Sequence, residues 1–262
     1  MESKTLTEAK MRALPDLLLA RIQTILGENL RGFYLVGSLV TGDFDPSSSD
    51  VDLIAVTSTD LTEAEVARLD AMHAELIRTR PNLDNRIEVI YIAAAHLNAN
   101  GADYNIAEIS PGEPFHVKEI HHDQWTINWL ILREKSITLF GADPHTLVDP
   151  IPHEKVVRVV QDLSRETPDW FEPSHLGGQS YVILTLCRGL RLVRTGDFVS
   201  KKQAALWAAD QFPEWSSLIL KTLVWRVVGH TDTTDPLALY PEIQRLVYFL
   251  VDQIVGSAEA LS

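Results

Sequence analysis

The spacing of apolar residues changes once along this chain, and the change divides it into two parts. Up to about residue 150, stretches with helical spacing alternate with short apolar runs that are typical of strands. From residue 153 onwards, apolar positions recur at helical spacing almost to the end. Pro150 and Pro152 stand between the two parts, so we expect one domain over 1–150 and a second over 151–262.

In the first part, the pattern predicts a helix, two strands, a second helix and a third strand. The expected ranges are 6–28 (helix, closed by Gly27), 32–36 and 50–56 (strands), 61–79 (helix, capped by Asp60 or Thr62) and 86–92 (strand). The order of these five elements describes a small mixed sheet with helices on one side. They are followed by a strand at 115–118, a helix at 124–134 and a short strand or extended segment at 136–141.

In the second part, the pattern predicts only helices. They cover 153–166, 178–195, 200–211, 214–228 and 239–257, and the stretch after Pro168, which contains Trp170, is expected to be a loop facing a cleft. The fold class is therefore α+β, with a mixed-sheet domain followed by an all-helical bundle. A ligand site is expected between the two domains.

Charge and composition narrow the class of partner. Acidic residues outnumber basic ones 36 to 23, which gives a net charge of −13, so nucleic acid is not an expected partner and a small cationic ligand is favoured. The N-terminus lacks a signal peptide's apolar core, and no apolar run approaches the length that spans a membrane. The single cysteine, Cys187, lies in an apolar run and is expected to be a buried thiol. We therefore expect a cytoplasmic protein without a membrane partner, and a monomer.

The candidate chemistry begins where the first expected strand ends. Gly37 allows a sharp turn there, and Ser38 offers a hydroxyl and a backbone N–H. After a turn-rich spacer, Asp50 and Asp52 stand two apart at the start of the next strand, so both carboxylates are expected on one face. Two neighbouring carboxylates repel each other unless a cation lies between them, and such oxygen ligands suit Mg²⁺ that carries substrate phosphates.

In the expected strand 86–92, Glu88 is the odd charge within an apolar run, and on the strand beside Asp52 it would join the same site. A lone Asp-x-Asp carries little information, since Asp43 and Asp45 repeat it in a turn; the full order of strand, Gly-Ser, spacer, Asp-x-Asp and strand acid is far more specific. The alternative is a turn role for Asp50 and a salt-bridged, structural Glu88.

This order of motifs resembles the nucleotidyltransferase superfamily related to DNA polymerase β. Segments of the second half narrow the resemblance to the aminoglycoside (3'')/(9)-adenylyltransferases, which modify streptomycin and spectinomycin: 123–141, Leu184-Thr185-Leu186-Cys187-Arg188, Thr195-Gly196 and 200–208. The resemblance extends from about residue 33 to residue 255. It implies a nucleotidyltransferase domain followed by the helical domain, with ATP as co-substrate, Mg²⁺ as cofactor and an antibiotic hydroxyl as acceptor.

The resemblance also implies roles for single residues. Asp50 and Asp52 would bind Mg²⁺, and Glu88 would act as general base at the acceptor hydroxyl. Gly37, Ser38 and Ser49 would lie at the phosphates, while Arg188 and Lys201 would reach the nucleotide from the helical domain; without the resemblance, both read as solvated helix charges. Trp170 and Glu172 would bind the acceptor, although Trp170 is equally suited to packing.

One departure concerns the acceptor. Streptomycin-modifying members of the family follow the tryptophan with acidic residues, whereas Glu172 is the one acid within residues 171–178 here. This departure counts against streptomycin. Two other functions fit the same motifs: transfer of a nucleotide to another metabolite or to a protein side chain, and a nucleotide-binding regulatory module without catalysis.

Overall fold

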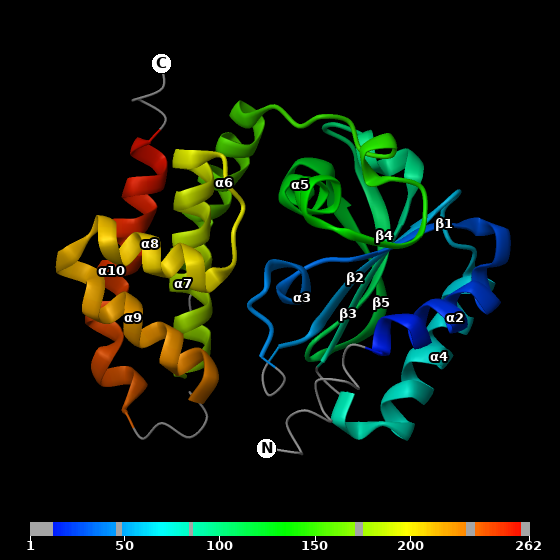
Figure 1. Cartoon of the computed structure of the whole chain (residues 1–262), viewed down its shortest axis with the longest axis horizontal. Helices are drawn as coiled ribbons and strands as arrows, with labels where there is room; N and C mark the ends of the chain where they lie inside the picture. The colour runs from blue at the N-terminus through cyan, green and yellow to red at the C-terminus, as the bar shows by residue number, and fades with distance from the viewer. Residues whose placement is uncertain (1–12, 46–48, 84–85, 171–174, 229–233, 258–262) are drawn as a thin grey trace. The chain divides into compact units, whose positions relative to one another are not determined.

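The computed structural model describes residues 13–45, 49–83, 86–170, 175–228 and 234–257. The chain divides into two compact units, Met1–Pro150 and Ile151–Ser262, and each is described by itself. The first unit holds a mixed sheet with helices and the second is helical (Figure 1), which confirms the expected α+β class. Among the helices of the described ranges, none is both long and apolar enough to cross a bilayer.

The first unit is built on a six-stranded sheet in the order β5-β4-β3-β2-β1-β6. The strands are β1 (Leu30–Leu35), β2 (Val51–Thr57), β3 (Ile87–Ala93), β4 (Asp103–Ser110), β5 (Glu113–His121) and β6 (Ile137–Gly141). The pair β2 and β3 is parallel and joined by helix α4 (Glu63–Thr79), whereas all other neighbours are antiparallel. The two central strands therefore begin at the same edge of the sheet.

One face of this sheet is a hydrophobic core. Helices α2 (Leu14–Leu26) and α4 pack on it, and the buried cluster includes Leu18 and Ile22 from α2 and Leu69 from α4, each 0% exposed. Burial of one such side chain contributes roughly 1.5–3 kcal/mol to folding. The opposite face carries helix α5 (Thr126–Lys135; Figure 1). Its fully buried Trp129 packs on His122. The two helices expected on one side of the sheet, at 6–28 and 61–79, correspond to α2 and α4, which share the first of these faces.

The ends of the helices follow local chemistry that the sequence displays. Gly27 ends α2 at φ +53°, a conformation that glycine tolerates best. Thr62 caps α4: its hydroxyl accepts a hydrogen bond from the Glu65 N–H, and the Glu65 carboxylate accepts one from the Thr62 N–H. Both boundaries agree with the expected ones.

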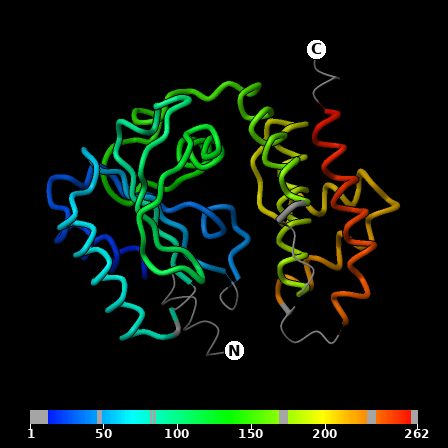
Figure 2. The backbone as a smooth tube through the Cα atoms, turned by 180° about the vertical axis from the view of Figure 1, so that it is seen from behind, coloured from blue at the N-terminus to red at the C-terminus, as the bar shows by residue number. Residues whose placement is uncertain are grey.

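The second unit is a bundle of helices whose positions agree with the expected ones. They are α6 (His153–Trp170), α7 (Leu176–Thr195), α8 (Lys201–Gln211), α9 (Pro213–Val228) and α10 (Pro236–Gly256). Helix α7 contacts each of the others, and Figure 2 shows α6, α7 and α10 running side by side. Cys187 on α7 is fully buried, as expected, and burial raises the pKa of its thiol to about 12.

Two segments differ from the sequence-based expectation. The sequence predicted one strand at 115–118, whereas the structure has the hairpin of β4 and β5. Asn105 and the buried Glu108 interrupt the apolar residues of β4, so the segment lacks a continuous apolar run. The stretch after Pro168 was expected to form a loop, but α6 continues through Pro168 to Trp170, and residues 171–174 lie outside the described residues.

His73 on α4 makes stability depend on pH. It is 1% exposed, its Nε2 lies 2.7 Å from the Tyr91 hydroxyl, and burial lowers its pKa to about 4. The unfolded chain takes up a proton near pH 6.5 and the folded chain only near pH 4, so acidification across this range should lower the free energy of unfolding by up to about 3 kcal/mol. His73→Gln, which stays neutral, should remove this part of the pH dependence in urea unfolding; an unchanged slope would contradict it.

Candidate nucleotidyl-transfer site

The structure brings together three of the acids that the sequence singled out. Asp52 on β2 is the register partner of Glu88 on β3, and Asp50 immediately precedes β2. Side chains at paired positions of neighbouring parallel strands project to the same face of the sheet. One carboxylate oxygen from each residue lies within 4.8 Å of the other two, and all three side chains are half-buried. The three acids therefore form one cluster at the start of the two central strands.

The cluster is electrostatically strained in a way that favours a cation. The pKa of Glu88 is raised to about 8, first by burial and then by the negative charges of Asp52, Asp50 and Glu108, while Lys118 opposes this rise. A positive ion among these carboxylates would relieve the repulsion. Carboxylate oxygens are the ligands that Mg²⁺ prefers, so the donor set fits that ion.

Gly37 lies against this cluster, and Ser38 follows it in the chain. Gly37 follows β1 at φ +71°, and a Cβ placed on it would come within 1.7 Å of Oδ2 of Asp52. No other residue type leaves the Asp52 carboxylate where it is. Ser38 opens the single helical turn α3 (Ser38–Thr41), and its buried hydroxyl oxygen has no hydrogen-bond partner in the described part of the chain.

Ser49 is buried in the turn before Asp50. Its hydroxyl accepts a hydrogen bond from the Asp45 N–H at 2.9 Å, and its carbonyl accepts one from Nε of Arg86 at 2.8 Å. Sequence reasoning missed Arg86, which directly precedes the Glu88 strand. Burial lowers the pKa of its guanidinium, and the carboxylates of Asp50 and Asp45 oppose this. Arg86 thus anchors the turn that carries Asp50.

Glu108 and Lys118 are further charged residues that the sequence analysis missed. Glu108 on β4 is the register partner of Ile90, which lies two residues after Glu88 on the same face of β3. The Lys118 ammonium pairs with the Glu108 carboxylate and lies 5.3 Å from the ring centroid of Trp125. The sequence signal that could have indicated Glu108 is its own position, a charge between two apolar residues, as for Glu88.

The remaining predicted residues belong to the helical unit. Arg188 on α7 places its guanidinium carbon 4.8 Å from the Phe198 ring centroid, and the ammonium of Lys201 lies 3.8 Å from that of Tyr181. Ser200 and Gln203 form a capping box that fixes Lys201 at the first position of α8. Trp170 ends α6, and Glu172 lies outside the described residues.

Comparisons with known proteins match both units. The family "Nucleotidyltransferase domain" matches residues 19–122, and "Aminoglycoside adenylyltransferase, C-terminal domain" matches residues 146–252. The first unit thus matches a nucleotidyltransferase domain and the second matches the C-terminal domain of aminoglycoside adenylyltransferases, so the chain is a nucleotidyltransferase.

Full-length relatives agree with this assignment. A Staphylococcus aureus spectinomycin 9-adenylyltransferase is 26% identical over 90% of this chain and 92% of its own. A Rhizobium radiobacter aminoglycoside (3'') (9) adenylyltransferase is 23% identical over 92% and 91%. The fold matches the crystal structure of an Enterococcus spectinomycin adenyltransferase, AAD(9), which was solved with ATP and spectinomycin. The TM-score is 0.73 and the sequence identity is 21%, and the match covers 90% of this chain and 96% of that one.

The contact between Gly37 and Asp52 yields a test of this site. Gly37→Ala should displace the Asp52 carboxylate and lower nucleotidyl transfer by about 10²-fold, because a shift of about 1 Å at a reacting group costs that much. Gly42→Ala is the matched control, since Gly42 also has a positive φ (+76°) but a Cβ there meets nothing within 4 Å. Equal losses in the two variants would show that backbone strain, and not Asp52, is responsible.

Proposed function

We propose that this enzyme transfers the adenylyl group of ATP to a hydroxyl of a small cationic antibiotic, spectinomycin or streptomycin, and releases pyrophosphate. The observation that carries the proposal is the convergence of Asp50, Asp52 and Glu88 on one face of the sheet. The families that the two units match, and relatives named for spectinomycin and aminoglycosides, support the reaction and the class of acceptor. The net charge of −13 favours a cationic acceptor over a polyanionic one.

Asp50 and Asp52 are the residues that would hold Mg²⁺, because their oxygens lie together and the Asp52 carboxylate lies against Gly37. When bound, the ion would neutralise charge on the triphosphate and polarise the α-phosphate. The buried hydroxyl of Ser38 is suited to donate a hydrogen bond to a phosphate oxygen. The hydroxyl of Ser49 already accepts a hydrogen bond from Asp45, and its carbonyl accepts one from Arg86. Ser49 would therefore act on a phosphate indirectly, by fixing the position of this segment next to Asp50.

Glu88 is the general base in this proposal. Its carboxylate takes the proton of the acceptor hydroxyl while the hydroxyl oxygen attacks the α-phosphorus. The bond from the α-phosphorus to the oxygen that bridges to the β-phosphate breaks, and pyrophosphate leaves with the electron pair. The raised pKa of Glu88, about 8, makes it a stronger base than an exposed glutamate, and a cation at Asp50 and Asp52 favours the ionised form that the step requires.

Arg188 and Lys201 are proposed to bind the nucleotide phosphates. Lys201 stands at the first position of α8, where the positive end of the helix dipole adds to the charge of its ammonium. Arg188 offers a planar set of donors that matches phosphate oxygens. Trp170 and Glu172 are proposed to contact the acceptor, Glu172 through its negative charge. With Glu172 as the one acid within residues 171–178, spectinomycin is the favoured acceptor.

The experiment that tests the proposal measures pyrophosphate release by the purified protein with ATP and Mg²⁺, in the presence of spectinomycin and of streptomycin separately. We expect release that depends on one of the drugs. Tight binding of Mg-ATP without release in either case would refute the antibiotic as acceptor and leave a nucleotidyltransferase with another substrate.

Glu88→Gln and Asp52→Asn separate the chemistry from nucleotide binding. Glu88→Gln should lower turnover by about 10²- to 10⁴-fold, because it removes the base, while the Kd for ATP stays unchanged. Asp52→Asn should abolish release through loss of the metal ligand. Glu119→Gln, an exposed position on β5, should leave both quantities unchanged. Full turnover of Glu88→Gln would overturn the assignment of the base.

Lys201 and its neighbour provide a test of the helical unit. Lys201→Ala should raise the KM for ATP by about 10- to 100-fold, the effect of losing a charge-assisted hydrogen bond. Lys202→Ala, which removes an exposed charge on the same helix, should leave the KM close to that of the wild type. A common response of both variants would indicate a general effect of charge and not a phosphate contact.

A further inference from the structure

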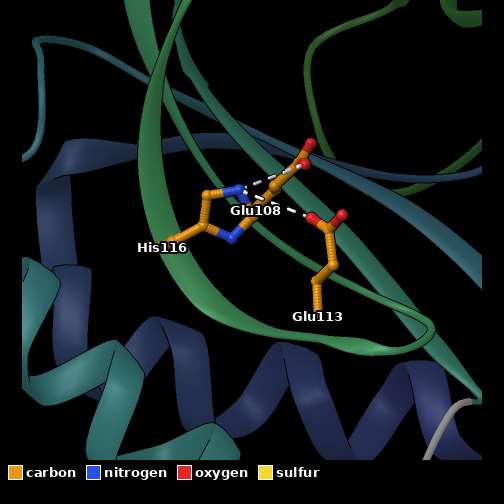
Figure 3. A group of neighbouring side chains, drawn as sticks. All are labelled: Glu108, Glu113 and His116. Carbon is orange, nitrogen blue, oxygen red and sulfur yellow. Dashed lines mark ion pairs between the residues drawn. The ribbon is translucent and has the colours of Figure 1, made fainter.

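The β4–β5 hairpin carries a second group of side chains with metal-ligand chemistry. Glu108, Glu113 and His116 each offer one ligand atom, and these atoms lie within 4.8 Å of one another (Figure 3). Glu108 and His116 are direct partners across the two strands, and Glu113 precedes His116 by three residues. Nε2 of His116 lies 3.6 Å from Oε1 of Glu108 and 3.7 Å from Oε2 of Glu113. One short hairpin thus aims three donors at a common point.

The contact of the second ring nitrogen of His116, Nδ1, indicates which nitrogen carries the hydrogen in the neutral ring. Nδ1 lies 2.9 Å from the carbonyl oxygen of Pro114, and because a carbonyl oxygen only accepts hydrogen bonds, Nδ1 carries the hydrogen. In the neutral ring, Nε2 then bears a lone pair, which points at Glu108 and Glu113. Three acceptors that face one another repel unless a proton or a metal cation lies between them. Fixing of the ring by a backbone carbonyl is the usual arrangement of a metal-binding histidine.

The negative charge around this point is not fully balanced by the neighbouring positive charge. Lys118 pairs with Glu108, and its single positive charge does not balance the carboxylates of both Glu108 and Glu113. The side chain of Glu108 is only 7% exposed, so its charge needs compensation more than an exposed one does. A carboxylate has two oxygens with about four lone-pair sites, so Glu108 can accept from Lys118 and still bind an ion.

The donors indicate the class of ion. An imidazole nitrogen with carboxylate oxygens suits Zn²⁺ and similar divalent transition ions, whereas Mg²⁺ prefers oxygen alone. Bonds of about 2.0–2.2 Å in a tetrahedral site place the ligand atoms roughly 3.3–3.6 Å apart. The separations at His116 Nε2, 3.6 and 3.7 Å, are close to that value. Glu113 is exposed and free to adjust.

We propose that Glu108, Glu113 and His116 form a binding site for a divalent transition ion of the Zn²⁺ class, distinct from the all-oxygen site at Asp50, Asp52 and Glu88. Three protein ligands leave a fourth position of a tetrahedral ion for water. The ion joins the two strands of the hairpin near its turn, so binding should stabilise the fold in proportion to the concentration of the ion.

The test uses the full-length protein without a histidine tag, in excess Mg²⁺. Equilibrium dialysis measures Zn²⁺ bound per chain, and the visible absorption of Co²⁺ reports its coordination. We expect one ion per chain and a higher thermal midpoint with Zn²⁺. His116→Ala should weaken binding by at least about tenfold. His121→Ala is the matched control, since His121 lies on the same strand and pairs instead with Asp103 at 2.7 Å.

The Asp50→Asn, Asp52→Asn double variant shows which site holds the ion. It should lose transfer activity and keep full binding of Zn²⁺, so this proposal and the proposed function fail separately. Absence of Zn²⁺ and Co²⁺ from the wild type would mean that a proton alone occupies Nε2 of His116. Binding that survives His116→Ala, or that disappears in the double variant, would place the ion elsewhere. Each of these three results overturns the proposal.

Discussion

The structure of the first unit depends on holding three carboxylates together against their mutual repulsion. Asp52 and Glu88 are adjacent because β2 and β3 pair in parallel and in register, and Asp50 is held next to them by the turn that Arg86 anchors. The free energy needed for this arrangement comes from the opposite face of the sheet, where α2 and α4 bury a continuous apolar surface. Stability resides on one face and the candidate chemistry on the other.

The division of the sheet into an apolar face and a charged face also explains where the other charged residues near the cluster lie. On the face opposite the core, Glu108 adds a fourth negative charge near Glu88, and Lys118 supplies a positive one. The pKa of Glu88 reflects the balance of burial and these charges. Close approach matters as much as charge, because the carboxylate of Asp52 occupies the space that any side chain at position 37 would fill.

Much of the fold was predictable because its signals are local. Gly27 and Thr62 fixed helix ends through their own backbone and capping chemistry, and the helical spacing of the second half located each helix of the bundle. Strand β4 was missed because Asn105 and Glu108 interrupt its apolar residues and its burial depends on both neighbouring strands. Glu108 was missed with it. Proline at position 168 suggested the end of a helix, but α6 continues past it.

By itself, the sequence determined the class of fold and the identity of the three clustered acids, because strand periodicity places Asp50, Asp52 and Glu88 at strand starts. Only the tertiary structure decided that β2 and β3 are neighbours in register, which brings the carboxylates within 4.8 Å. It alone brought Arg86 to Ser49 and Glu108 to His116. Such contacts depend on which strands pair and in which register, and that choice is made by the packing of the whole sheet on its helices.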